Sequence, residues 1–138
     1  MELVGSPRGV LLFDDFAHHP TAIATTLEGL RQSGSGGRLF AVIEPRSNTM
    51  RLGAHRERLA DCVGAADRVL WFQPSGMDWD MEAVAAESSV DSSVHSSVDD
   101  IIEALVSDCV SGDRVVVMSN GGFQGIHRRL LAALEGGD

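Results

Sequence analysis

The stretch of sequence that decides the fold reads Val10-Leu11-Leu12-Phe13-Asp14-Asp15-Phe16-Ala17-His18-His19-Pro20-Thr21. Its short apolar run, followed at once by two acids, predicts a buried strand rather than a helix. Pro20 suits the first position of a helix, because its missing N–H would be unpaired there in any residue. The turn between them therefore places two carboxylates and two imidazoles at the carboxyl end of a strand. They lie beside a helix N-terminus, which favours an anion.

The rest of the chain repeats this alternation of strand and helix. Strands are predicted at 38–44, 68–72 and 114–118, and amphipathic helices at about 20–32, 49–66, 100–110 and 126–134. Alternating strands and helices favour right-handed crossovers and a parallel sheet. The predicted fold class is therefore α/β, with a Rossmann-like, mainly parallel, twisted sheet and helices on both of its faces.

Three segments are less regular. Residues 1–9 contain glycine, serine and proline and are expected to form an interdomain linker or a truncated end, which leaves 10–138 as one domain. Residues 81–87 are expected to form one or two helical turns. The repeat Ser-Ser-Val-Asp, Ser-Ser-Val-His, Ser-Ser-Val-Asp at 88–99 is expected to be a surface loop whose last unit caps the helix that follows. We assign the repeat no function.

Composition excludes several classes of protein. The net charge of −9 argues against nonspecific binding to nucleic acid or to an anionic membrane. All 11 basic residues are arginine, so a P-loop, which needs a lysine, is absent from this sequence. The two cysteines, Cys62 and Cys109, fall among apolar residues and are expected to be buried free thiols of a cytoplasmic protein. No signal peptide or membrane-length apolar run is present in the sequence.

Three turns that follow strands are expected to meet at one edge of the sheet, because parallel strands end together and ligands bind there. The polar residues of these turns are Asp14, Asp15, His18 and His19; then Arg46, Ser47, Asn48 and Arg51; then Ser119, Asn120 and the pair Gly121-Gly122. Each has an ordinary structural explanation, such as a helix cap, a solvated surface arginine or a permissive glycine turn. Together they offer an acid for a ribose hydroxyl, an imidazole for phosphate and a guanidinium for a carboxylate.

The residues of all three turns resemble a known family. The stretch 14–21 looks like the Asp-Asp-Tyr-Gly-His-His-Pro motif that begins the C-terminal domain of the ATP-dependent Mur ligases of bacterial peptidoglycan synthesis. The match continues through Glu44-Pro45-Arg46-Ser47-Asn48-Thr49-Met50-Arg51 and Met118-Ser119-Asn120-Gly121-Gly122-Phe123-Gln124-Gly125-Ile126-His127. It runs from about residue 10 to 134 and weakens over the serine-rich repeat. Among Mur ligases it is closest to the murein peptide ligases of peptidoglycan recycling, which serve cell wall biogenesis and cell shape.

The resemblance implies an enzyme whose other domains are not in this sequence. Such ligases join L-alanyl-γ-D-glutamyl-meso-diaminopimelate to UDP-N-acetylmuramate through an acyl phosphate, using ATP and Mg²⁺ held mainly by a central domain. It implies that Asp15 and His18 contact ATP, and that His18 lies near the reacting phosphate as a catalytic residue. It further implies that the tripeptide is bound by Arg46, Ser47, Asn48, Thr49, Ser119 and Asn120. This chain alone is expected to be inactive, and no metal ligand is assigned to it.

Other functions stay open at this point. Within the family, the nearest rival is the UDP-N-acetylmuramate alanine ligase, although it has a Gln-Pro-His-Arg signature where this chain has Glu44-Pro45-Arg46-Ser47. Outside it, the acids and histidines of the first turn, joined by His55 or His127, could form the metal site of a small hydrolase. The chain could also be a noncatalytic nucleotide-binding module, which a scattered arrangement of the three turns would favour.

Overall fold

The computed structural model describes residues 2–15, 20–33, 37–44, 61–72, 86, 90–118 and 125–136. Within these ranges one sheet has the strand order β1-β2-β6-β3-β4-β5. Its strands are β1 (Glu2–Gly5), β2 (Leu11–Asp15), β3 (Leu39–Ile43), β4 (Arg68–Phe72), β5 (Asp91–His95) and β6 (Arg114–Met118). The helices are α1 (Pro20–Ser33), α5 (Val98–Asp108) and α6 (Ile126–Gly136), and η1 (Pro7–Gly9) is a short 3₁₀ turn.

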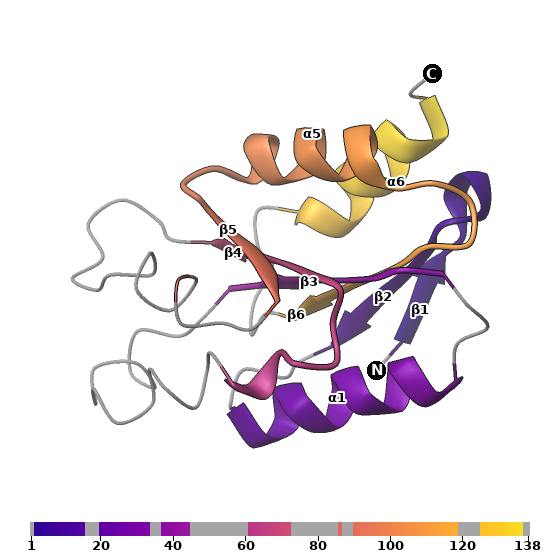
Figure 1. The fold of residues 1–138 in the computed structure, drawn as a ribbon. Coiled ribbons are helices and arrows are strands. Elements are labelled where there is room, and N and C mark those ends of the chain that lie inside the picture. The colour runs from indigo at the N-terminus through magenta and orange to yellow at the C-terminus, as the bar shows by residue number, and fades with distance from the viewer. Residues whose placement is uncertain are drawn as a thin grey trace.

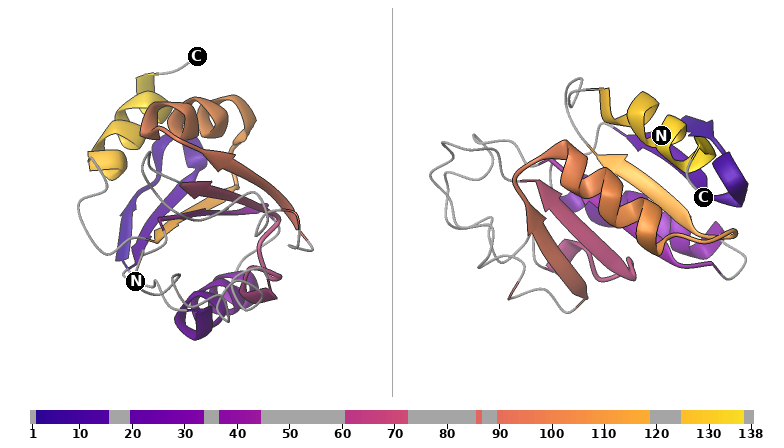
Figure 2. Two further views of the ribbon diagram at one scale, coloured as in Figure 1. Left: turned by 90° about the vertical axis from the view of Figure 1, so that its left-hand side faces the viewer. Right: turned by 90° about the horizontal axis from the view of Figure 1, so that it is seen from above.

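Helices cover both faces of this sheet, as predicted. Helix α1 lies on one face, and α5 and α6 lie together on the other (Figures 1 and 2). All five residues of β3 are buried. Successive side chains of a strand point to opposite faces, and here helices cover both faces. Leu39, Ala41 and Ile43 pack in the cluster that contains α1, whereas Phe40 and Val42 pack in the cluster that contains α5 and α6. The continuous apolar runs of β3 and β6 therefore reflect burial on two sides.

The helices bury the apolar stripes expected from their spacing. In α1 the buried residues Ile23, Leu27 and Leu30 recur every three or four positions. Val63 and Ala66 join the same cluster, but the prediction that they are helical is wrong, because the helix ends at residue 62 and a turn follows it. Helix α5 begins at Val98, two residues earlier than expected, and the Ser97 hydroxyl accepts a hydrogen bond from the Asp100 N–H at 3.1 Å. The predicted cap is thus confirmed.

The order of the strands creates a topological switch point at one edge of the sheet. Neighbouring strands are parallel throughout, except that β1 runs antiparallel to β2. The chain crosses from β2 to β3 through α1 on one face, then returns through α5 on the other face and inserts β6 between β2 and β3. Chain leaving neighbouring strands toward opposite faces opens a crevice outside their carboxyl ends, where ligands of such sheets bind.

Two of the three irregular segments contain strands that were not expected. The prediction that 88–99 forms a loop is wrong for residues 91–95, because these residues form β5, paired in parallel with β4. Residues 2–5 lie within the segment expected to be a linker, yet they form β1 and pair with β2. The domain boundary after residue 9 stays a prediction. The helical turns predicted at 81–87 lie almost entirely outside the described residues.

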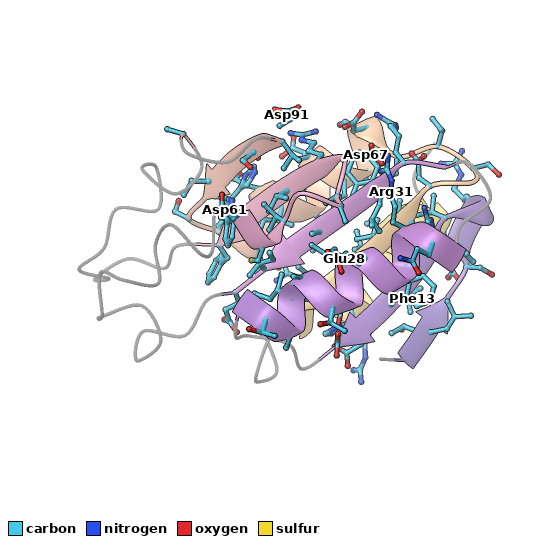
Figure 3. The ribbon with its side chains drawn as sticks, turned by 60° about the horizontal axis from the view of Figure 1, so that its bottom comes forward. Phe13, Glu28, Arg31, Asp61, Asp67 and Asp91 are labelled. Carbon is cyan, nitrogen blue, oxygen red and sulfur yellow. The ribbon has the colours of Figure 1, made fainter. Side chains whose placement is uncertain are left out.

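The amino edge of the sheet, where the parallel strands begin, carries a set of ion pairs. Arg31, at the end of α1, lies 2.9 Å from Asp67, just before β4 (Figure 3). The other pairs are Arg38 with Asp108 and Asp113, at 3.1 and 3.0 Å, and Arg68 with Asp108 at 2.7 Å. These contacts join the ends of helices to the starts of strands, so this edge has a structural role.

Candidate functional site at the carboxyl edge of the sheet

Three neighbouring strands end side by side at the edge opposite these ion pairs. In the sheet register, Met118 at the end of β6 aligns with Asp15 of β2 on one side and with Ile43 of β3 on the other. The glutamate that follows β3 extends this contact, since the N–H of Glu44 donates to the carbonyl of Met118 at 3.0 Å. The strands that lead into the three motif turns therefore end at adjacent points.

Of the predicted site residues, the structure describes Asp15. The other members lie outside the described residues: His18, Arg46, Ser47, Asn48, Thr49, Ser119 and Asn120. The same holds for His19, Arg51, His55 and the glycines at 121 and 122. Their assignments stay predictions, whereas the strand ends that carry their turns are placed together.

The carboxylate of Asp15 is oriented by α1. The Thr26 hydroxyl donates a hydrogen bond to its Oδ2 at 2.5 Å in a partly buried position. A hydrogen bond that fixes one carboxylate oxygen defines the direction of the other. Sequence reasoning missed Thr26, although its place between Ile23 and Leu30 on the apolar side of α1 was a usable signal, because a hydroxyl there needs a partner.

Asp14 points to the opposite face of the sheet and meets α6. Its Oδ1 lies 2.8 Å from Nε2 of His127, in the first turn of that helix. The two atoms are within hydrogen-bonding distance, although the ring is not oriented to form a hydrogen bond in this structure. The side chains are only 29% and 21% exposed, respectively. The sequence placed both residues near the site but gave no indication that they are in contact.

The described residues give limited support to a metal site. No group of three or more histidine, cysteine, aspartate or glutamate side chains in the described ranges is arranged to hold a metal ion. Asp14, Asp15 and His127 are near one another along the edge, but Asp14 and Asp15 face opposite sides of the sheet.

Other features lie away from the ends of β2, β3 and β6. A cavity of about 350 Å³, lined by residues that include Arg8, Val10 and Ser111, opens at the amino edge. It is therefore remote from Asp15. On β5, Oγ of Ser93 lies 2.7 Å from Nε2 of His95. Burial and the charge of Arg68 lower the pKa of His95, and the charge of Asp100 opposes this.

Among the helices that the structure describes, none has both the length and the apolar character needed to cross a membrane.

Comparisons with known proteins agree with this geometry. Residues 1–121 match the family model of the Mur ligase, glutamate ligase domain. Over 135 residues the chain is 44% identical to the UDP-N-acetylmuramate--L-alanyl-gamma-D-glutamyl-meso-2,6-diaminoheptandioate ligase of Escherichia coli (strain K12), covering 97% of this chain and 30% of that protein. A UDP-N-acetylmuramate--L-alanine ligase of Mycobacterium ulcerans (strain Agy99) is less similar, at 33% identity over 146 residues, with 97% and 29% covered.

Solved structures give the same result. The crystal structure of a murein peptide ligase from Psychrobacter arcticus 273-4 has a TM-score of 0.90 and 49% identity, covering 98% of this chain and 29% of that one. A domain of such a ligase from Haemophilus ducreyi 35000HP, crystallised alone, has a TM-score of 0.82 and 34% identity, with 96% and 98% covered. The chain spans about 30% of the length of the relatives it matches. The family match, the sheet and the three adjacent strand ends together show that this chain belongs to the Mur ligases, as their glutamate ligase domain.

Proposed function

We propose that this chain is the C-terminal domain of an ATP-dependent ligase that joins the murein tripeptide L-alanyl-γ-D-glutamyl-meso-diaminopimelate to UDP-N-acetylmuramate in peptidoglycan recycling, in the bacterial cytoplasm. The observation that carries the proposal is the 44% identity to the E. coli ligase of that name over 97% of the chain. The three motif-bearing strand ends at one edge of the sheet support it. The lower identity to the alanine ligase makes that alternative less well supported.

The chemistry divides the work between this domain and the rest of the enzyme. ATP phosphorylates the carboxylate of the UDP-sugar, and the amine of the tripeptide then attacks the acyl phosphate. Phosphoryl transfer of this kind depends on positioning and on neutralising charge. The missing domains would hold UDP-N-acetylmuramate, most of the ATP and Mg²⁺. Glu2 pairs with Asp14 across β1 and β2, so an upstream domain joined there would face the three turns.

In this proposal, each turn has its own task. The carboxylate of Asp15 accepts hydrogen bonds from the ribose hydroxyls of ATP. The hydrogen bond from the Thr26 hydroxyl orients the carboxylate for this contact. His18 lies at the phosphates near the start of α1, whose N-terminus favours negative charge. The guanidinium of Arg46 holds a carboxylate of the tripeptide, with Ser47, Asn48, Thr49, Ser119 and Asn120 as hydrogen-bonding partners.

The test is a substrate comparison with the full-length enzyme. UDP-N-acetylmuramate and ATP are offered with either the tripeptide or L-alanine, and the product is identified by mass spectrometry. Ligation of the tripeptide, with little or none of alanine, is expected. Preferential ligation of alanine would overturn the proposal in favour of the alanine ligase, and no ligation of either would remove the assigned activity.

Two variants separate the roles of the turns. Arg46→Ala should lower kcat/KM for the tripeptide by about tenfold to a thousandfold, which corresponds to about 1.4–4 kcal/mol for a charge-assisted contact. Asp15→Ala should raise the KM for ATP instead. Arg31→Ala is the matched control, since Arg31 is an exposed arginine paired with Asp67 at the other edge. Unchanged tripeptide kinetics for Arg46→Ala would reject its assignment.

A further inference from the structure

We propose that Asp14 and His127 form a positioning pair that holds the nucleotide turn and the peptide turn of the site in register. Asp14 is followed directly by Asp15 and the turn 16–19, and His127 follows the turn 119–125 by two residues. Their contact, with Oδ1 and Nε2 2.8 Å apart, joins the end of β2, which leads into the first turn, to the start of α6, which follows the other turn. The inference rests on the proposed function, because it assigns both turns to one reaction.

The chemical environment of Asp14 requires such a partner. Leu12, two residues earlier on the same strand face, is fully buried, and Asp14 is aligned in the sheet with the buried Val117 of β6. A carboxylate that continues an apolar face loses hydration, and this costs free energy unless a donor or a positive group compensates. His127, in the first turn of α6, brings Nε2, a ring nitrogen that can carry a donor proton, to within 2.8 Å of this carboxylate.

The position of His127 also explains what the pair can control. Ile126, the neighbouring residue, is fully buried in the cluster beneath α6, so the start of this helix is fixed against the sheet in depth. The contact with Asp14 adds a lateral constraint at the point where the turn 119–125 enters the helix. A shift of about 1 Å between two reactants can cost about a hundredfold in rate. A pair that fixes one turn relative to the other therefore acts on the rate through geometry, without touching the substrate.

Helix α6 contains a second ion pair, away from β2, that serves as a control for the contact between Asp14 and His127. Arg129, two residues after His127, forms an ion pair with Asp99 of α5. Its side chain is 41% exposed and that of Asp99 is 78% exposed, so this pair lies on the outer surface. Loss of Arg129 removes one ion pair from the same helix but leaves the contact between the helix and β2 intact.

The test is a double-mutant cycle in the full-length enzyme with Asp14→Ala, His127→Ala and the double variant. Each single change should lower kcat by about tenfold to a hundredfold, with the KM values for ATP and tripeptide nearly unchanged. The double variant should be no worse than either single variant, because both remove the same contact. His127→Gln should keep most of the activity, since its amide nitrogen can occupy the place of Nε2, and Arg129→Ala should keep all of it.

The outcomes that count against the inference are separate from those that count against the function. If the wild-type enzyme does not ligate the tripeptide, the proposed function fails and the pair has no reaction to position. If it does, then additive losses, a loss confined to KM, or a His127→Gln variant as slow as His127→Ala would overturn the pair alone. Urea unfolding of the isolated domain identifies any variant that does not fold. If an alanine variant does not fold, the kcat of His127→Gln tests the proposed pair in its place.

Discussion

Replacing Asp113 by alanine is expected to destabilise this domain more than replacing its more exposed neighbour Asp108. The side chain is only 3% exposed. Its Oδ1 accepts the N–H of Arg38 at 3.0 Å, and its Oδ2 accepts the N–H of Val110 at 2.9 Å and the guanidinium of Arg38 at 3.0 Å. Alanine leaves two partly buried N–H groups without an acceptor, at about 1–2 kcal/mol each. The guanidinium is 45% exposed and can return to water, so it adds little.

The expected loss is therefore about 2–4 kcal/mol in the free energy of unfolding, or about 8–16 °C in melting temperature for a domain of this size. Urea unfolding of the isolated domain measures it, with the fluorescence of the fully buried Trp71 as one signal. Asp108→Ala is the matched control, because Asp108 also pairs with Arg38 but is 33% exposed, and it should cost less than about 1.5 kcal/mol. A loss below about 1 kcal/mol for Asp113→Ala, or equal losses for both variants, would refute the reasoning from buried N–H groups.

Three further predictions concern acid, thiols and backbone space. Burial by itself raises the pKa of Asp67, but the N–H of Leu39 and the guanidinium of Arg31 outweigh it and hold the pKa below the ordinary value of 3.8. Asp67→Asn should therefore lower stability at pH 7. In urea titrations the difference from wild type should start to shrink as the pH falls through that ordinary value and should vanish only below the lowered pKa of the folded state. Burial raises the pKa of both cysteine thiols to about 12, so neither should react quickly with a disulfide reagent at pH 8 until urea is added, and rapid labelling of the folded domain would contradict this. Gly37→Ala should prevent normal folding, because the Cβ of the new alanine would lie 1.7 Å from the carbonyl oxygen of Gly112. The same change at Gly29 of α1 places the Cβ in open space and should raise the melting temperature slightly.

The helices and the central strands could be predicted from the local pattern of apolar and polar residues. The boundaries of β4 and β6 match the predicted strands residue for residue, because a short apolar run between polar residues has few other uses in a soluble domain. Strand β5 was missed because serine favours loops. At the edge of the sheet, however, Val94 packs against the core while Ser92 and Ser93 stay half-buried, so pairing with β4 overrides local preference. Strand β1 was missed for a similar reason, since its glycine and the proline after it look like a linker.

The candidate site was readable only in part. Asp15 could be placed at a strand end from its position after the apolar run, and the adjacency of the three strand ends followed from a parallel sheet. The partners of the two acids could not be placed in the same way. Thr26 reaches Asp15 across 11 residues and His127 reaches Asp14 across 113, and no local periodicity encodes which side chains meet over such separations.

The two edges of the sheet divide stability from function. The amino edge carries paired charges that tie α1 and α5 to the starts of β3, β4 and β6, whereas the carboxyl edge carries the turns assigned to the substrates. Strands are stiff connections, and each core cluster is packed along the full length of β3. Loss of an amino-edge pair should therefore change the fraction of folded enzyme and leave kcat per folded molecule unchanged. Loss of the Asp14 and His127 contact should do the reverse, because this contact joins the ends of two elements that border the turns proposed to hold the substrates. Measuring both quantities on Asp108→Ala and His127→Ala distinguishes the two edges, and equal effects on kcat would show that the sheet does not separate them.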